Sequence, residues 1–196
     1  KTMGNQGTLR GSMPDVLTMS QLFRNNGYHA GRVSKIYHMK IPMEIIAGTA
    51  ESDDPHSWDE VVNVKAPEQH APGTKTQWSP KDKGSQTFTG IEADGDDEVH
   101  ADGKAAGHAI KFLKANKKRP FFLAVGFVRP HVPFVSPKSY YAPFPHDEMK
   151  LPEKIKGDWD DIPRAGINYK TSKNMQMNVL RQKKAVAGYY ASVAYM

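Results

Sequence analysis

Apolar residues recur at helical spacing in three parts of the chain. The first part begins at Thr18, which stands three residues before Gln21, and this spacing is typical of the capping box that starts a helix. An apolar face follows at Met19, Leu22 and Phe23. The pattern therefore predicts a short helix from Thr18 onward.

Two strands are predicted beside the helices. Gly27 is a natural end for the first helix, because glycine tolerates the left-handed conformation of the residue that follows a helix, and residues 28–35 then predict a short strand. Residues 121–128 form an unbroken apolar run, which favours a strand covered on both faces of a sheet. A second helix comes before this run and ends at Pro120. The succession of helix, short loop and buried strand is typical of an α/β fold.

The second and third helices are predicted from their own apolar faces. Asp102 is expected to cap the second helix, and lysines in its last turn suit the negative end of the helix dipole. The third helix is still running at Met196, with neither glycine nor proline to close it. We expect an internal fragment of a larger protein, with a true helical C-terminus as the alternative. The expected apolar faces are Ala106, Ala109, Ile110 and Leu113 in the second helix, and Val186, Tyr189, Tyr190 and Val193 in the third.

The segment between the first strand and the second helix lacks any such pattern. Residues 39–97 mix glycine, proline, serine and aspartate without periodicity, and no element is predicted there. Long loops in compact domains are often functional, so we expect a functional role for this one. The acidic residues at 94–98 do not match a calcium-binding loop, because Val99 and Ala105 stand where that loop needs glycine and glutamate. A solvated turn is expected instead.

Composition narrows the class of protein. A chain of 196 residues suits one domain with a substantial core. The mean hydropathy is −0.64, and no apolar run approaches the ~20 residues that a membrane-spanning helix needs. The chain has no cysteine, which excludes disulfides, cysteine-ligated zinc and a cysteine nucleophile within it. The excess of basic residues is spread out and is not interleaved with aromatic ones, so no nucleic-acid partner is expected.

Polar chemistry is concentrated at the ends of the two predicted strands. Lys35 and His38 follow the first strand, and His131 follows the second. Ligands of open α/β sheets bind beyond the carboxyl ends of the strands, where a lysine supplies a compact cation for an anionic group and a histidine supplies a proton donor. The alternative is a surface lysine with hydrogen-bonded loop histidines. The other histidines lack the spacing of a zinc pair, and the usual phosphate-loop, dinucleotide and serine-hydrolase motifs are absent from the sequence.

Two sets of motifs surround these residues. Residues 18–23 (TMSQLF), 26–28 (NGY) and 34–38 (SKIYH) form the first set, while 120–127 (PFFLAVGF) and 129–134 (RPHVPF) form the second and more specific set. Their order and approximate spacing resemble the sulfatase family, in the branch of iduronate-2-sulfatase and its bacterial relatives. The resemblance also includes Ser57-Trp58 and Tyr189-Tyr190-Ala191-Ser192-Val193.

The resemblance implies an alkaline-phosphatase-like α/β fold, of which residues 1–196 would be an incomplete, internal part of one catalytic domain. It implies hydrolysis of a sulfate ester on a sugar or polysaccharide, by a formylglycine together with a divalent cation, usually calcium. Both would lie outside this span, so no metal ligand is expected within it. The resemblance further implies an exported or lysosomal protein, whose partner is a sulfated carbohydrate.

The resemblance also implies roles for four residues. Lys35 would contact the sulfate and the formylglycine, and His38 would hydrogen-bond the formylglycine hydrate and help to expel sulfate from the covalent intermediate. His131 would bind the sulfate and act as an acid toward the leaving oxygen, and Arg129 beside it would bind substrate. Fixed cations and a proton donor suit a transition state in which negative charge grows on the sulfate and on the leaving oxygen.

Departures from the family pattern leave two other functions open. Ser34 stands where the family usually has glycine, which questions the backbone geometry before Lys35. The paired aspartates of the metal site, the C/S-x-P-x-R nucleophile motif and the later Asp-His-Gly motif have no counterpart, so these residues alone are expected to be inactive. A non-catalytic module that binds anionic polysaccharide is one alternative, favoured by the net charge of +6. A phosphatase or phosphonate hydrolase of the same fold is the other.

Overall fold

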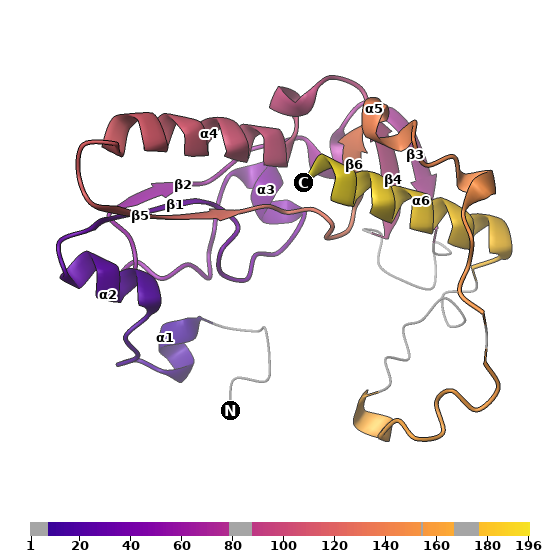
Figure 1. The fold of residues 1–196 in the computed structure, drawn as a ribbon, viewed down its shortest axis with the longest axis horizontal. Helices are drawn as coiled ribbons and strands as arrows, with labels where there is room; N and C mark the ends of the chain where they lie inside the picture. Colours follow the sequence, from indigo (N-terminus) through magenta and orange to yellow (C-terminus); the bar gives the residue numbers. More distant parts are fainter. Residues whose placement is uncertain (1–7, 79–87, 154, 167–176) are drawn as a thin grey trace.

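The computed structural model describes residues 8–78, 88–153, 155–166 and 177–196. They form two three-stranded sheets that lie side by side (Figure 1). The first sheet is entirely parallel, with β1 (His29–Ser34) between β2 (Glu60–Val62) and β5 (Phe121–Gly126). The register pairs His29 with Phe121 and Ser34 with Gly126, so β1 and β5 end at the same level. The predicted α/β class is confirmed.

The second sheet is mixed. Its central strand β4 (Thr89–Ala93) pairs antiparallel with β3 (Gly73–Gln77) and parallel with β6 (Phe134–Pro137). The residues between β5 and β6 therefore cross from one sheet to the other, and they include His131. The expectation of no regular element over residues 39–97 was wrong. Four elements of that segment belong to the sheets or pack beside them, namely α3 (Met43–Ala47), β2, β3 and β4.

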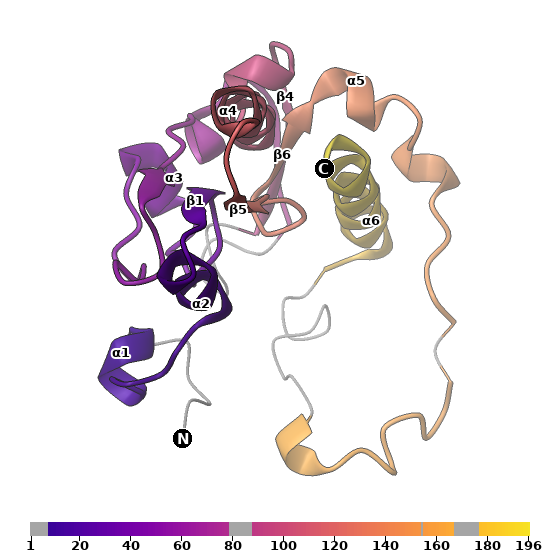
Figure 2. The same ribbon diagram turned by 60° about the vertical axis from the view of Figure 1, so that its left-hand side comes forward.

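Three longer helices pack on the sheets. The helices α2 (Met19–Asn25) and α4 (Ala101–Asn116) cover opposite faces of the first sheet, and α6 (Val179–Tyr195) lies on the second (Figures 1 and 2). No described helix is long and apolar enough to cross a bilayer. The remaining short helices are α1 (Leu9–Ser12), α5 (Lys138–Tyr141), η1 (Glu68–His70), η2 (Asp97–Val99), η3 (His146–Glu148) and η4 (Arg164–Gly166).

The boundaries of α2 follow the predicted signals. Thr18 is the N-cap, and its hydroxyl oxygen accepts a hydrogen bond from the amide of Gln21 at 3.1 Å. The reciprocal half of the capping box does not form, because the side-chain oxygen of Gln21 accepts instead from the guanidinium of Arg10. Gly27 has φ +82° directly after the C-cap, as predicted for the residue that ends the helix.

The start and the buried face of α4 differ from the prediction. The helix begins at Ala101, and Asp102 lies inside its first turn rather than capping it. Ile110 and Leu113, expected on the buried face, are 50% and 44% exposed. The buried side is one of mostly small residues, and its one large member, Phe112, lies over Gly31 of β1, where a β-carbon would come within 2.2 Å of the ring.

The same difference occurs in α6. Tyr189, Tyr190 and Val193 are 45%, 47% and 42% exposed, although they were expected to face the core. Mostly small residues of α6 face the second sheet instead. Gly188 packs closely on Trp78, since a β-carbon at this glycine would lie 2.9 Å from the indole ring. A helix packs closest to a sheet through its smallest side chains, so Tyr189, Tyr190 and Val193 are displaced to the outer side, while Tyr195 at the end of the helix is buried. The buried residues of α6 are Ala187, Gly188, Ala191, Ser192 and Tyr195.

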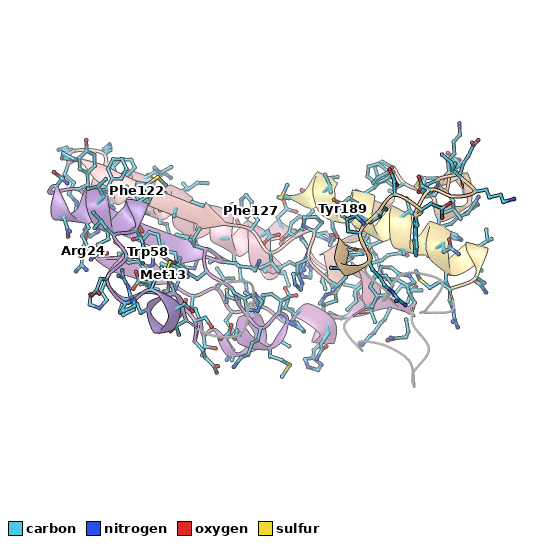
Figure 3. All side chains as sticks on the ribbon, turned by 90° about the horizontal axis from the view of Figure 1, so that it is seen from below. Met13, Arg24, Trp58, Phe122, Phe127 and Tyr189 are labelled. Atoms are coloured by element: carbon cyan, nitrogen blue, oxygen red, sulfur yellow. The ribbon has the colours of Figure 1, made fainter. Side chains whose placement is uncertain are left out.

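Helices contact both faces of β5, as predicted, but the strand is only half-buried. It is the edge strand of the first sheet, and Val125 is 36% exposed. Phe122 stacks on Phe23 with ring centroids 4.9 Å apart and also faces Trp58 at 6.4 Å (Figure 3). The main apolar core lies on the other face, around Val33 and the buried alanines of α4.

Candidate active site

Two loops leave the first sheet at the same edge. Lys35 follows the last residue of β1, and its amide donates a hydrogen bond to the carbonyl of Gly126, the last residue of β5, at 3.2 Å. Because β1 and β5 are parallel neighbours in register, the loop with Lys35 and His38 and the loop with His131 both start at this carboxyl edge. Ligands of α/β sheets bind at such an edge.

The backbone turns sharply just before Lys35. Ser34 has φ +59°, a left-handed conformation that favours glycine, and its side chain is completely buried. Its hydroxyl has no hydrogen-bond partner among the described residues, while its carbonyl accepts from the guanidinium of Arg32. Arg32 is itself buried and pairs with Asp53 at 2.6 Å. The serine thus occupies a position whose geometry suits the glycine that the family usually has there.

The loop that carries Lys35 and His38 is fixed by Tyr37. The Tyr37 hydroxyl lies 3.1 Å from the hydroxyl of the buried Ser57, which also lies 2.7 Å from the hydroxyl of Thr18. Among the described residues, the ammonium of Lys35 and the imidazole of His38 have no hydrogen-bonded or ionic partner. Lys35 is half-buried and His38 is exposed, so both side chains remain available to a ligand.

An ion pair lies beneath this loop. Ser57 donates to the carboxylate of Asp54 at 2.6 Å, and Arg10 contacts both oxygens of the same carboxylate at 3.0 and 2.8 Å. The hydrogen bond from Arg10 is the main cause that lowers the pKa of Asp54 from 3.8 to about 2. Ser57 and Trp58, noted in the sequence only as part of the family resemblance, therefore belong to the support of the site: the indole of Trp58 donates to Asp53 at 3.1 Å.

His131 lies on the exposed surface of the second loop. Its amide donates to the carbonyl of Val128 at 2.9 Å, and its Nδ1 lies 2.7 Å from the carbonyl oxygen of Val132. A carbonyl oxygen only accepts, so this contact places a proton on Nδ1 and leaves Nε2 directed to other partners. Among the described residues, no hydrogen bond joins His131 to Lys35 or His38.

Arg129, which was expected to bind substrate, is buried and hydrogen-bonded within the protein. The side chain is 1% exposed, and all five of its N–H groups are used. Two bond the carboxylate of Glu68, at 2.6 and 2.7 Å, and three bond the carbonyls of His131, Pro133 and Val135 at 3.0, 2.8 and 2.8 Å. In this arrangement every N–H group of Arg129 has a partner within the protein, and the guanidinium holds the His131 loop.

Asp102 also supports the loop that carries His131, although the sequence analysis expected it to cap α4. Its carboxylate accepts from the amides of Val128 and Arg129 at 2.7 and 2.9 Å, and so ties the start of α4 to the end of β5. Burial raises the pKa of Asp102, against the effect of Arg129 and the two amides. No sequence signal separates this aspartate from a helix cap, because both tasks need an acidic residue at a helix start.

The described residues do not fit a metal site. None of their histidine, aspartate and glutamate side chains gather in groups of three or more that could hold an ion. A calcium ion of the kind that the family resemblance implies would therefore need ligands other than these residues.

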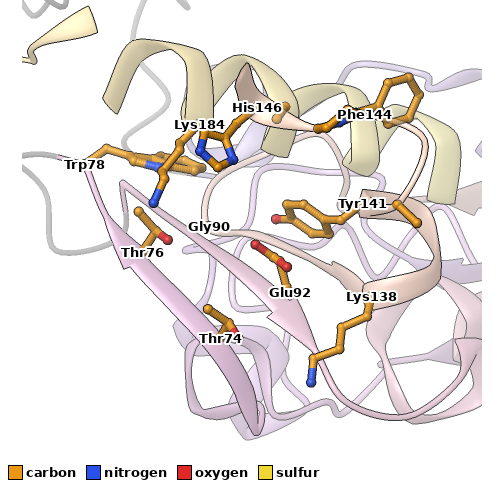
Figure 4. A pocket seen from close by; sticks show the side chains of 13 residues that line it. Thr74, Thr76, Trp78, Gly90, Glu92, Lys138, Tyr141, Phe144, His146 and Lys184 are labelled. Atoms are coloured by element: carbon orange, nitrogen blue, oxygen red, sulfur yellow. The ribbon is translucent and has the colours of Figure 1, made fainter. Parts of the chain in front are cut away.

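A cavity lies away from these two loops, on the second sheet. It has a volume of about 400 Å³ and is bounded by β3, β4, α5 and α6, with Glu92, Tyr141 and Lys184 among its lining residues (Figure 4). None of the four residues expected in the site lines it. The tyrosine hydroxyl is already engaged, since it donates to the carbonyl of Phe134 at 2.8 Å.

Comparisons with known proteins agree with the motifs. The chain is 25% identical over 195 residues to a sulfatase of Formosa agariphila. The aligned region covers 93% of this chain and 36% of that protein. It is 28% identical over 202 residues to the iduronate 2-sulfatase of Mus musculus, covering 91% of this chain and 34% of that protein. An arylsulfatase of Clostridium perfringens is 31% identical over 105 residues, which are 52% of this chain and 21% of that protein.

The extent of these matches defines what is shared. The chain spans about a third of the length of the first two relatives. The family model for sulfatases matches residues 2–196, and the observed parallel sheet, with helices on both faces, agrees with the α/β architecture of that alkaline-phosphatase-like group. This chain belongs to the sulfatase family.

Proposed function

We propose that the protein carrying this chain hydrolyses a sulfate ester of a sugar or polysaccharide, and that Lys35, His38 and His131 take part in the reaction. The observation that carries the proposal is the register of β1 and β5, which starts the loops of all three residues at one carboxyl edge. The side chains of Lys35 and His38 are free of partners among the described residues, and the family match supplies the chemical class.

Each residue has a task that its surroundings allow. The compact ammonium of Lys35 suits an oxygen of the sulfate, and His38 three residues later lies within the same loop. Water and the ester give an alcohol and free sulfate, and the leaving oxygen needs a proton when the alcohol is a sugar. Protonated His131 can supply it from Nε2, and the neutral ring that remains keeps its proton on Nδ1, next to the carbonyl of Val132.

In this proposal the nucleophile and the metal site lie in parts of the protein outside residues 1–196. The formylglycine would supply the nucleophile, and a divalent cation, calcium in our expectation, would hold the sulfate. Residues 1–196 would then be the middle part of one catalytic domain and inactive without the other parts. Two relatives named iduronate 2-sulfatase support a substrate of the sulfated-sugar class. Because such carbohydrates are met outside the cytoplasm or in lysosomes, an exported or lysosomal setting is part of the proposal.

The test uses the complete protein that contains this chain. We expect release of sulfate from an aryl sulfate and from sulfated uronic-acid disaccharides, with at least a hundredfold lower rate for Lys35→Ala at equal folded fraction. Faster turnover of phosphate esters than of sulfate esters would replace the proposal by a phosphatase. No turnover of either, with heparin binding that survives Lys35→Ala and His131→Ala, would replace it by a polysaccharide-binding module.

A further inference from the structure

We propose that Glu68 is a positioning residue for His131, acting through Arg129. This rests on the proposed function in one respect, the proton transfer assigned to His131. Glu68 lies in the segment between β2 and β3, which was expected to be a structureless loop, and sixty-one residues separate it from its partner. Nothing in its local sequence indicates a role at the site.

The ion pair between Glu68 and Arg129 is shielded from solvent. Both are 1% exposed, and the two carboxylate oxygens of Glu68 each accept one N–H of the same guanidinium nitrogen. The other three N–H groups of Arg129 bond the carbonyl of His131 itself and those of Pro133 and Val135, which follow it. The guanidinium of Arg129 therefore holds the backbone of the His131 loop in one conformation, and the carboxylate of Glu68 holds the guanidinium in place.

Two costs are concentrated at Glu68. A fully buried ion pair loses its hydration, and good geometry only partly offsets this loss. In addition, Glu68 has φ +47°, a left-handed conformation that is unfavourable for a residue with a β-carbon. Backbone strain of this kind persists where the surrounding structure demands it, often at functional sites.

The position of the strained residues strengthens the inference. Among the described residues, Ser34 and Glu68 are the two non-glycine residues with positive φ. Ser34 immediately precedes Lys35, and its carbonyl is held by the buried Arg32. Glu68 holds the arginine whose bonds shape the loop of His131. Each of the two loops of the candidate site is thus supported by one left-handed residue and one buried arginine with an acidic partner.

A purely structural role makes a different prediction. If the pair only joins the two sheets, its loss lowers stability and affects every substrate equally. If it positions His131, its loss mainly impairs proton donation, because a displacement of about 1 Å can reduce a rate on the order of 10²-fold. An aryl sulfate with a good leaving group needs little protonation, whereas a sugar sulfate needs a full proton.

The kinetic test compares three variants of the complete protein at equal folded fraction. Glu68→Gln keeps the shape but leaves the guanidinium without its charged partner. Arg129→Lys keeps the charge but has three N–H donors instead of five, so it cannot bond Glu68 and all three carbonyls at once. For both we expect kcat on a sugar sulfate to fall by roughly 10–100-fold, kcat on a nitrophenyl-type aryl sulfate to fall less than about threefold, and KM to change little. Equal losses on both substrates would overturn the proposal.

The matched control is Asn116→Ala. Asn116 is equally buried and hydrogen-bonded, to Phe112 and Arg119, but it lies at the far end of α4 from the site. It should lower the melting temperature without changing the ratio of the two rates. Should it shift that ratio as much as Glu68→Gln does, the effect is one of stability alone and the proposal fails.

A second readout does not depend on activity. Hydrogen exchange followed by mass spectrometry should show faster exchange in peptides covering 130–137 for Glu68→Gln and Arg129→Lys, where the amides of His131 and Val135 are bonded within the loop, and no change there for Asn116→Ala. Unchanged exchange would overturn the positioning role whatever the rates are. If the unmodified protein releases no sulfate while the exchange changes as expected, the proposed function fails and the role of Glu68 in ordering this loop stands.

Discussion

The carbonyl oxygen of Lys35 lies directly against Gly126, so closely that a β-carbon at that glycine would come within 1.6 Å of it. The two residues come from neighbouring parallel strands, and the amide of Lys35 also bonds the carbonyl of Gly126. The last residue of β5 must therefore lack a side chain for the backbone of Lys35 to lie where it does.

Gly126→Ala should displace Lys35 from the sheet edge. Backbone atoms cannot rotate away as a side chain can, so we expect a loss of about 1–3 kcal/mol in the free energy of unfolding. Sulfate release by the complete protein should fall on the order of 10²-fold. Gly107→Ala is the control, since nothing lies within 4 Å of a β-carbon there and alanine in the interior of α4 should stabilise by about 0.5–1 kcal/mol. Full activity of Gly126→Ala would contradict the packing described.

Ser34→Gly should stabilise the protein. The substitution relieves a left-handed residue, which costs roughly 1–2 kcal/mol with a β-carbon, and it removes a buried hydroxyl that has no partner among the described residues. Part of the gain is offset by the greater freedom of glycine in the unfolded chain. Ser34→Ala separates the two causes, because it removes the hydroxyl and keeps the strain. Denaturant unfolding measures both, and a Ser34→Gly protein no more stable than Ser34→Ala would show that the strain is unimportant.

Acid should weaken the support beneath the Lys35 loop only at low pH. The pKa of Asp54 is lowered from 3.8 to about 2, chiefly by Arg10, so the folded state favours the carboxylate. Its contribution to stability is therefore complete above about pH 4 and is lost as the pH falls toward 2. Asp54→Asn should be less stable than the unmodified protein at pH 6, and the difference should shrink between pH 4 and 2 in melting curves.

The control for this experiment is Glu51→Gln, which removes an exposed ion pair with Lys40. Exposed pairs contribute little, so its melting temperature should follow that of the unmodified protein at every pH. An Asp54→Asn protein with the same pH dependence as the unmodified one would show that this carboxyl does not titrate as described.

The strands of the site were predictable, but the packing of the helices was not. Residues 121–128 show strand character by their length and apolar content alone, and β5 covers 121–126. For α6 the same reasoning selected Tyr189 and Val193, whereas the helix turns Ala187, Gly188, Ala191 and Ser192 inward. Periodicity identifies large apolar residues, but the distance between a helix and a sheet is set by the smallest ones.

The supports of the site could not be predicted for a related reason. The positions of Lys35 and His131 follow from local sequence, because each stands shortly after a strand. The bond between Glu68 and Arg129 depends on how a segment without periodicity folds back across sixty-one residues, and Arg129 in the sequence is equally suited to bind substrate. Which partner an arginine has is decided by the tertiary fold, and this determines whether it binds substrate or holds a loop.

The most direct test of the proposed chemistry compares His131→Ala with Lys35→Ala in the complete protein, on a nitrophenyl-type aryl sulfate and on a sugar sulfate, with the folded fraction controlled. His131→Ala should lower kcat on the sugar sulfate by roughly 10²–10⁴-fold, the usual contribution of a general acid, and should affect the aryl sulfate much less. Lys35→Ala should impair both substrates alike, because it serves the sulfate rather than the leaving oxygen. An equal loss on both substrates for His131→Ala would contradict its role as the proton donor.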